Sequence, residues 1–311
     1  MKLFIIFTAV ILFLLILLTV ASFVALGMMT HNIKRKSKAS KERALDADIL
    51  FGDKIAEGVR HIQETPFEEW RIKSFDGLSL YGRYFKNVDS KKTIILLHGF
   101  RSSGEHDFSC AFKMYFDHGF NILIPDQRAH GKSEGKYICY GVLERYDAFG
   151  WIEKVITEKG EEEKIYLSGV SMGASTALMA SGLSLPKNVR GIIADCGFTS
   201  PSEIIKKVMR EDMGFPLFPV FYTTRLLVKL VAKFDLDYSC LDALKTNDIP
   251  MLFIHGTADN FVPFYMGEQN FEGCKSEKYS IWVDKAGHGT SFLFETERCV
   301  KVLEEFTSKY L

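Results

Sequence analysis

The fold of this chain is decided by residues 164–180, KIYLSGVSMGASTALMA. The stretch opens as a short apolar, β-branched run, typical of a buried strand, and closes on small helix-forming residues. Between them lies Gly169-x-Ser171-x-Gly173. So sharp a strand-to-helix turn needs neighbours with almost no side chain, and the helix N-terminus favours developing negative charge. The pattern predicts that Ser171 is a nucleophile, although G-x-S-x-G also occurs by chance in glycine-containing turns.

Composition excludes some classes of function. Basic and acidic side chains number 39 each, so the formal net charge is zero and nothing points to a nucleic acid partner. The six cysteines form no C-x-x-C pair and show no metal-ligand spacing. Several lie in apolar runs, as reduced core cysteines do, which favours a reducing compartment over a disulfide framework.

The amino-terminal segment is apolar. No charged residue occurs from Leu3 to Met29, and this run is longer than the roughly 20 residues that a helix needs to cross a bilayer. We therefore predict a transmembrane anchor at residues 1–30. A cleaved signal peptide is the alternative, with a cleavage site at Val20-Ala21-Ser22, but its apolar region would exceed the roughly 7–15 residues typical of such signals.

Flanking charge predicts the orientation of this segment. Only Lys2 and the α-amine precede it, whereas a basic cluster follows it, made of Lys34, Arg35, Lys36, Lys38, Lys41 and Arg43. Because basic flanks stay in the cytoplasm, the pattern predicts a single-pass protein of the cell membrane whose large domain lies on the cytoplasmic side.

Residues 31–66 are expected to form a basic linker that leads into a helix. Apolar residues fall near helical spacing between Ala44 and Ile62, with Gly52 as a gap in the stripe. A helix docked on the domain is the favoured interpretation, and a helix on the membrane surface is the other. Pro66 marks its end, and a domain at 67–311 follows.

Strands and helices alternate through that domain. Trp70–Ser74 and Leu78–Phe85 flank the turn signal Asp76-Gly77, so they predict an antiparallel hairpin. Parallel strands are expected at Thr93–Leu97, Asn121–Pro125, Lys164–Val170, Val189–Asp195, Met251–His255 and Lys278–Val283, and helices at Asp107–His118, Gly141–Lys159, Gly173–Leu183, Met266–Phe271 and Ser291–Tyr310. This alternation predicts an α/β fold, in which a mostly parallel sheet has helices on both faces and binds ligands beyond the carboxyl ends of its strands.

A polar loop follows the strand that ends at Leu97. In His98-Gly99-Phe100, the glycine lets the backbone turn close to the nucleophile. The amides of Phe100 and Met172 would then donate to an oxyanion, and His98 would brace the loop rather than act as a base. In the next loop, residues 125–135, we interpret Asp126 and Arg128 as an internal ion pair that sets the loop shape.

A serine nucleophile needs a base, and the base needs an acid that orients it. His288 follows the last expected strand and lies between two glycines, and Asp259 lies in the turn after the preceding strand. Ser, Asp, His is one of the orders in which such triads occur. Two other acids also follow strands and are the alternatives, Asp195 and Asp284. His255 lies inside its strand, so we interpret it as a satisfied core group.

Taken together, the motifs resemble those of the α/β-hydrolase superfamily. The matching residues are Gly169-Val170-Ser171-Met172-Gly173, His98-Gly99, Asp126-x-Arg128-x-His130-Gly131-x-Ser133, His255-Gly256-x-x-Asp259-x-x-Val262-Pro263 and Ala286-Gly287-His288. They cover the chain from about residue 67 to its end. The most similar branch is that of the bacterial serine-aminopeptidase and monoacylglycerol-lipase-like hydrolases.

This resemblance implies an eight-stranded central sheet and hydrolysis through an acyl-enzyme, with no metal and no other cofactor. It assigns site roles to particular residues, namely Ser171 as nucleophile, His288 and Asp259 as triad partners, Phe100 and Met172 as oxyanion-hole amides, and Gly169 and Gly173 as the nucleophile elbow. It implies no particular substrate, because this branch includes esterases, lipases, thioesterases and peptidases.

Residues 198–249 are expected to form a small helical cap over the site. Pro201–Arg210 and Thr223–Phe234 read as helices around an aromatic, proline-broken passage, whose side chains would either line an acyl-binding pocket or pack on the core. Basic residues recur every fourth position in the second helix, at Arg225, Lys229 and Lys233. They predict either a stripe that faces the membrane or a solvated face.

The sequence thus predicts a membrane-anchored serine hydrolase that cleaves a carboxylic ester of a small or lipid-like acyl group. A serine peptidase, an aminopeptidase or an acyltransferase that uses the same triad is the nearest alternative. A catalytically silent binding module of this fold is the alternative from another class.

Overall fold

The computed structural model describes residues 1–32 and 38–310, with the backbone alone described for 38–49. Its sheet has eight strands in the order β1-β2-β4-β3-β5-β6-β7-β8. They are β1 (Glu68–Lys73), β2 (Ser79–Phe85), β3 (Lys92–Leu97), β4 (Asn121–Pro125), β5 (Lys164–Val170), β6 (Val189–Asp195), β7 (Met251–Gly256) and β8 (Lys278–Val283). Strand β2 is antiparallel to β1 and β4, and the remaining pairs of the sheet are parallel. The expected mostly parallel α/β sheet is confirmed.

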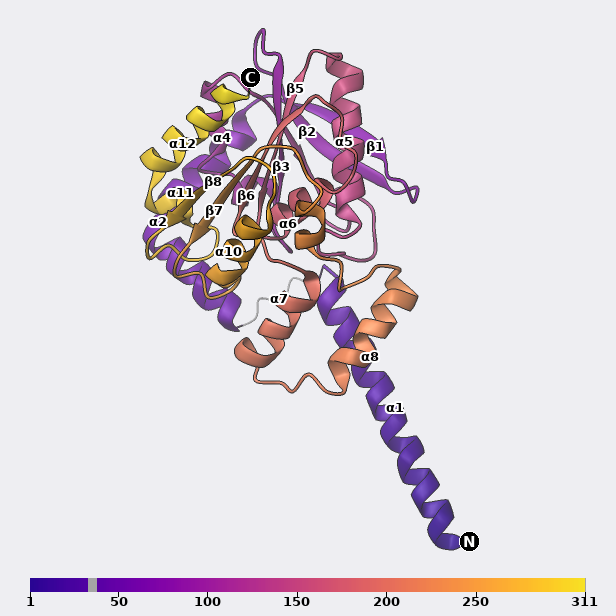
Figure 1. Cartoon of the computed structure of the whole chain (residues 1–311). Coiled ribbons are helices and arrows are strands. Elements are labelled where there is room, and N and C mark those ends of the chain that lie inside the picture. The colour runs from indigo at the N-terminus through magenta and orange to yellow at the C-terminus, as the bar shows by residue number, and fades with distance from the viewer. Residues whose placement is uncertain (33–37, 311) are drawn as a thin grey trace.

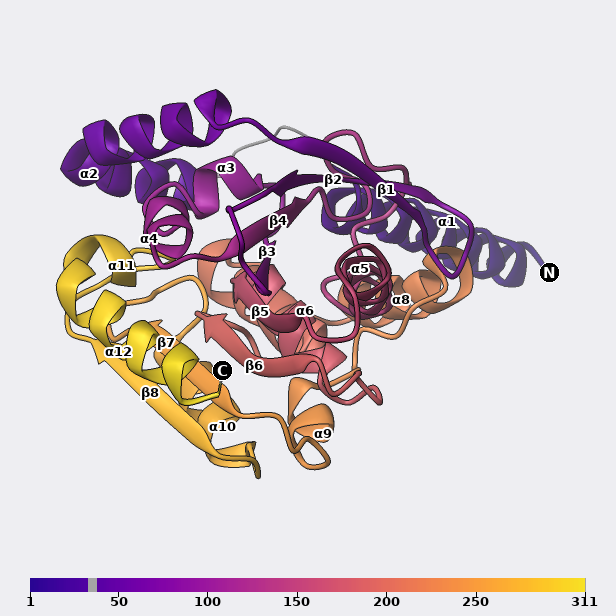
Figure 2. The same ribbon diagram turned by 90° about the horizontal axis from the view of Figure 1, so that it is seen from above.

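Both faces of the sheet are buried. Consecutive strand residues point to opposite faces, so their side chains enter two different cores. In β3, Ile94 packs into one core and Ile95 into the other, and neither is exposed. Such nearly continuous apolar strands require helices on both faces. Figure 2 shows these two layers, with α5 (Glu144–Lys159) and α6 (Met172–Ala180) on one side and α4 (Phe112–Asp117) and α12 (Thr296–Lys309) on the other.

The helices differ from the sequence prediction mainly at their ends. The segment expected as one helix at Asp107–His118 is divided into α3 (Gly104–Asp107) and α4, and Ser291–Tyr310 is divided into α11 (Ser291–Phe294) and α12. Helix α10 (Phe264–Gly273) is longer than expected. Helix α9 (Cys240–Leu244), which the sequence analysis missed, is too short to produce a helical pattern of apolar residues.

Helix α1 (Lys2–Thr30) is long and apolar enough to cross a membrane, and it projects away from the sheet in Figure 1. Its residues through Ala21 are almost all exposed, whereas Ser22 and Leu26 are buried against the rest of the protein. The expected apolar amino-terminal helix is present. Its last turns belong to the packed domain.

Helix α2 (Lys38–Glu64) is docked on the domain, as the favoured interpretation held. It packs against α3 and α4 and buries Ile62 completely. It is longer than the expected 44–62 and continues through Gly52. The basic residues Lys34, Arg35 and Lys36, which support the predicted orientation, lie outside the described residues.

The insertion after β6 forms a cap at the end of the domain where α1 leaves it (Figure 1). Its helices are α7 (Pro201–Lys207), a π-helical turn η1 (Val208–Asp212), α8 (Val220–Leu227), a second π-helical turn η2 (Val228–Ala232) and α9. Helix α8 lies beside α1, and the hydroxyls of Ser22 and Thr223 are 2.6 Å apart. The cap is therefore in direct contact with the amino-terminal helix.

Most of the positive charge in the basic stripe expected on the second cap helix is paired with aspartates. Arg225 pairs with Asp237 at 2.8 Å, and Lys229 pairs with Asp235 at 2.9 Å. Lys233 lies past the helix end, with a left-handed φ of 59°. Two of the three positive charges are thus offset by aspartates that follow the helix, and we do not propose this stripe as a site that binds anionic lipid.

Backbone contacts hold β3, β5 and α6 close together. A Cβ atom on Gly173 would lie 1.8 Å from the Leu97 carbonyl oxygen, and one on Gly169 would lie 2.2 Å from that of Gly173. Both distances are far inside van der Waals contact. These two positions therefore need glycine for close approach rather than for an unusual φ.

We predict that Gly173→Ala destabilises the protein by about 3 kcal/mol or more, because the added methyl group has no room and backbone must move. Gly52→Ala is the matched control. Among the described residues, nothing outside its own stretch of helix lies within 4 Å of the added methyl group, and a helix-interior alanine should add up to about 1 kcal/mol. Thermal unfolding of the two variants tests this, and wild-type stability of Gly173→Ala would contradict it.

Candidate active site

Ser171 lies at the turn between β5 and α6. Its φ of 56° and ψ of −116° are rare for a residue with a side chain and cost of the order of 1–3 kcal/mol. Its amide donates to the Asp195 carbonyl oxygen at 2.8 Å, which helps to hold this conformation. The serine is therefore presented at the N-terminus of α6, beyond the carboxyl end of the sheet.

A continuous path of hydrogen bonds connects Ser171 with His288 and Asp259. Nε2 of His288 lies 2.9 Å from Oγ of Ser171, and Nδ1 lies 2.7 Å from Oδ2 of Asp259. Because a carboxylate only accepts, Nδ1 carries the proton and Nε2 is left to accept from the serine. The structure thus brings together the three residues that the sequence analysis selected, in the geometry of a nucleophile, a base and an orienting acid.

Asp259 is held as an anion despite its burial. Its Oδ1 accepts hydrogen bonds from the amides of Phe261 and Val262 at 2.9 and 3.0 Å. Burial alone would raise its pKa, but the nearby rings of His288 and His255 reverse that effect and hold the pKa of this carboxyl below its usual range. A negative charge next to Nδ1 would stabilise an imidazolium if His288 accepted a proton.

The rival acids do not bond to His288. Asp195 is buried at the end of β6, where burial raises its pKa to about 7, and its Oδ1 has no partner among the described residues. Asp284 is exposed and accepts from the Thr257 hydroxyl at 3.2 Å. Neither is placed to orient the base.

His255 is more than the satisfied core group that we expected. Its Nε2 lies 2.9 Å from the Val262 carbonyl oxygen and 3.3 Å from Oδ2 of Asp259, while its Nδ1 has no partner among the described residues. The ring therefore lies against Oδ2 of Asp259, the same carboxylate oxygen that His288 bonds. The feature of the sequence that could have indicated this contact is the separation of only four residues between His255 and Asp259.

The loop after β3 is braced as expected, and Asp107 takes part. Nδ1 of His98 lies 2.8 Å from the Gly99 carbonyl oxygen, and its Nε2 accepts from the Gln127 amide at 3.1 Å. Asp107, which the sequence analysis did not single out, accepts from the Gly99 amide at 2.7 Å. These bonds hold the backbone of the loop beside Ser171, whose Cβ would lie 3.4 Å from a Cβ on Gly99.

The amides of Phe100 and Met172 are available as donors. Met172 is the first residue of α6, where a helix leaves its amides without partners. Within the described part of the chain, neither amide has an acceptor. The two amides therefore stay candidates for the oxyanion hole.

The expected ion pair between Asp126 and Arg128 is wrong. Arg128 instead makes two bonds to Asp147, at 2.6 and 2.7 Å, and two longer ones to Asp76 in the turn between β1 and β2. Asp126 accepts from the Lys132 amide at 2.8 Å. The guanidinium turns toward α5 because two carboxylates distant in sequence converge there.

One group of described residues has donor atoms close enough to hold a metal ion, Cys196, Asp259 and His288, within 4.8 Å of one another. Asp259 and His288 already bond to each other. Burial raises the pKa of the Cys196 thiol well above its usual value, which disfavours the thiolate that metals bind. The donor set therefore suits the hydrogen-bond path better than a metal.

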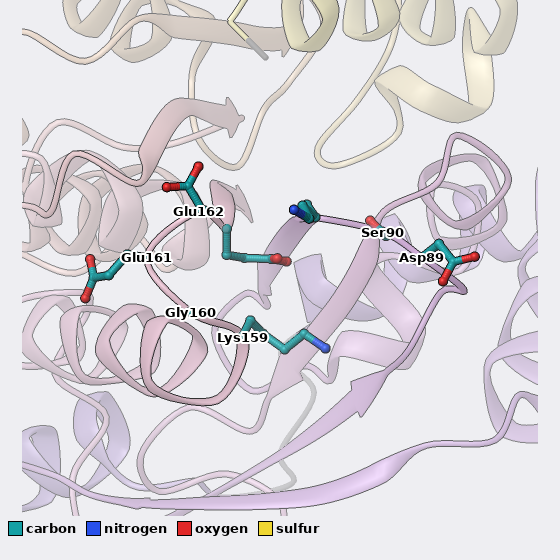
Figure 3. Close-up of a pocket in the computed structure, with 8 residues that line it drawn as sticks. Asp89, Ser90, Lys159, Gly160, Glu161 and Glu162 are labelled. Carbon is teal, nitrogen blue, oxygen red and sulfur yellow. The ribbon is translucent and has the colours of Figure 1, made fainter.

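A hollow of about 520 Å³ lies at the opposite end of the sheet, before β3 and β5 (Figure 3). It is lined by Asp89, Ser90, Lys91, Lys159, Gly160, Glu161, Glu162 and Glu163. In Figure 3 the carboxylates of Asp89, Glu161 and Glu162 point apart rather than toward a common centre. This hollow is separate from the candidate active site.

Comparison with known proteins agrees with this geometry. A family model for the α/β hydrolase fold matches residues 92–224. The uncharacterized protein YqkD of Bacillus subtilis (strain 168) is 26% identical over 289 residues, which cover 92% of this chain and 93% of that protein. The uncharacterized membrane protein YNL320W of Saccharomyces cerevisiae is 25% identical, with 73% of this chain and 77% of that protein covered.

Solved structures show the same fold. The structure of the esterase Pf2001 from Pyrococcus furiosus matches with a TM-score of 0.63 and 25% identity, covering 80% of this chain and 95% of that one. The family model and this structure support the superfamily that the sequence analysis named. The narrower branch stays a prediction.

We predict that Asp259→Asn severely impairs turnover, because the amide cannot hold the same tautomer of His288. Asp195→Asn should retain most activity, because Asp195 does not bond to the base. Rates of ester hydrolysis by the two purified variants decide which aspartate orients His288. The reverse result would move the acid to the end of β6.

Asp195→Asn should also change the pH dependence of stability. The pKa of this buried carboxyl is about 7 in the folded protein against an ordinary 3.8, so between these values the unfolded chain loses the proton and the folded protein keeps it. Stability of the wild type therefore falls as pH rises through this window. The gain in melting temperature from Asp195→Asn should grow between pH 4 and pH 7, and a constant difference would contradict this.

Proposed function

We propose that this α/β hydrolase is a serine hydrolase that cleaves carboxylic esters, with Ser171 as nucleophile, His288 as general base and Asp259 as orienting acid. The observation that carries the proposal is the hydrogen-bond path from Oγ of Ser171 through His288 to Asp259. The similarity to a protein named an esterase supports an ester as the substrate.

The geometry suggests how each group acts. Nε2 of His288 removes the Ser171 proton as Oγ attacks the carbonyl carbon, and the charge on the carbonyl oxygen is stabilised by the amides of Phe100 and Met172. His288 then gives the proton to the leaving alcohol, and an acyl ester of Ser171 remains. Water attacks this ester with His288 again as base, which releases the acid and restores the serine.

The cap supports a lipid-like acyl group. Large apolar side chains that are at least 48% exposed occur along it, at Phe215, Phe218, Tyr222, Leu226 and Leu230. The same cap contacts α1 through Ser22 and Thr223. A cap that exposes apolar side chains next to an apolar helix is suited to substrates that partition into membranes.

We also propose that α1 is a single-pass anchor in the cell membrane, with the hydrolase domain on the cytoplasmic side. The exposed part of α1, from Leu3 to Ala21, would extend about 28 Å, close to the thickness of the hydrocarbon core. The basic residues after it support this side.

The function is tested by Ser171→Ala and His288→Ala. Each should lower kcat on p-nitrophenyl esters by a factor on the order of 10⁴–10⁶, and the double variant should be little worse, because the triad acts as a unit. Wild-type protein should react with a fluorophosphonate probe and Ser171→Ala should not. A series of acyl lengths assayed beside aminopeptidase substrates separates esterase from peptidase. Absence of wild-type labelling would favour a silent binding module.

Topology is tested separately. A reporter fused after Leu311 should behave as cytoplasmic, and a short tag before Met1 should be accessible from outside, if the basic flank sets the orientation. A carboxyl-terminal reporter active only on the outer face would overturn the proposed side.

A further inference from the structure

The carboxyl end of α1 is bonded to the hydrolase domain at every free carbonyl. A helix leaves its last four carbonyl oxygens without partners in the helix. In α1, Gly27 accepts from the amide of the cap residue His31, at 3.1 Å. The next three carbonyl oxygens and that of His31 accept from residues far along the chain: Met28 and His31 from Nη2 of Arg101 at 2.5 and 2.7 Å, Met29 from the Tyr140 hydroxyl at 2.8 Å, and Thr30 from the Ile138 amide at 2.6 Å. The end of the helix is therefore part of the folded domain.

Two of these donors also hold Phe100, the candidate oxyanion donor. Arg101 is the next residue in the chain, and its guanidinium lies 4.6 Å from the centre of the Phe100 ring. The Tyr140 ring stacks on Phe100 with centres 5.0 Å apart and an interplanar angle of 23°. Phe100 is thus fixed by the same two side chains that bond to α1.

The backbone of Arg101 needs this support. Its φ of 55° lies in the left-handed region, which costs of the order of 1–3 kcal/mol for a residue with a side chain. Its amide donates to Nε2 of His130 at 3.1 Å. Burial lowers the pKa of His130 to about 3, so the ring stays neutral and Nε2 remains an acceptor. The bonds of His98 and Asp107 hold Gly99, whereas the conformation of Arg101 itself is held by this backbone bond and by its side-chain bonds to α1.

We propose that Arg101 is a positioning residue for the oxyanion hole and that the carboxyl end of α1 is the support through which it acts. This inference rests on the proposed function. Negative charge develops on the carbonyl oxygen only as the ester reacts. A displaced Phe100 amide therefore reduces the stabilisation of the transition state more than it reduces the affinity for the substrate. Loss of the support should therefore lower kcat and leave KM nearly unchanged.

The test uses the full-length protein in detergent micelles. Arg101→Met removes the bonds to α1 and keeps an unbranched side chain, and should lower kcat about 10-fold to 100-fold with KM within about 2-fold. The affinity for an alkyl boronic acid should fall by a similar factor, because its tetrahedral adduct with serine places an oxygen in the oxyanion hole. Arg101→Lys should retain more of kcat and of the boronic acid affinity than Arg101→Met does. Tyr140→Phe keeps the ring on Phe100, removes one bond to α1 and should cause a smaller loss.

Arg190→Met is the matched control. Arg190 also donates to a carbonyl oxygen at a helix end, that of Tyr310 after α12 at 2.9 Å, but it is exposed and belongs to the amino-terminal half of β6. It should change neither kcat nor boronate affinity. The inference is overturned if Arg101→Met and Tyr140→Phe keep both quantities at wild-type values, or if they lower only the melting temperature. A wild type that does not react with the fluorophosphonate probe would instead overturn the proposed function.

Discussion

The contact between the end of β3 and the start of α6 is the constraint on which the candidate site depends. Gly173 lies so close to the Leu97 carbonyl oxygen that no side chain fits between them. The distance between Ser171 and the loop that follows β3 is therefore set by contact between two backbone segments. Backbone packed in this way has little freedom to relax. This contact brings Ser171, the candidate nucleophile, close to Phe100, a candidate oxyanion donor, although about 70 residues separate them. The packed sheet must offset the entropy of closing that loop.

Two buried aspartates at adjacent strand ends differ in charge because of their hydrogen bonds. Both lose hydration, which raises the pKa of a carboxyl. Asp259 recovers the loss from two amides and two histidines, whereas Oδ1 of Asp195 has no partner among the described residues. Buried Lys207 of the cap bonds both Asp212 and the Asn260 carbonyl oxygen, and so holds the loop that carries Asp259. Hydrogen-bond partners keep the pKa of buried Asp259 low, whereas burial with an unpartnered Oδ1 raises the pKa of Asp195 to about 7.

The predictions from sequence succeeded where the information is local. The strand, turn and helix around Ser171 are contiguous in the chain. The order of polar strand ends also selected Asp259 and His288, which the structure places beside Ser171, and their catalytic roles stay predictions. The partner of Arg128 was missed because the neighbouring acid in sequence, Asp126, bonds a backbone amide instead. Nothing in the apolar pattern of α1 marks its last carbonyls as acceptors for Arg101, because backbone groups look alike in a sequence. Contacts between a backbone atom and a distant side chain are the part that a linear pattern does not encode.

The division of α1 into an exposed and a packed part favours an anchor over a cleaved signal. Cleavage after Ser22 would remove the hydroxyl that bonds Thr223 and would leave Phe23 as a new charged terminus beside the cap. Leu26 is 4% exposed in the main core, and burying a leucine contributes roughly 2 kcal/mol. The four capped carbonyls add to this, and each would be left unpaired if the last turns of the helix unwound. A segment that supplies both core side chains and capped carbonyls is part of the folded domain, and this supports the proposed anchor over a cleaved signal.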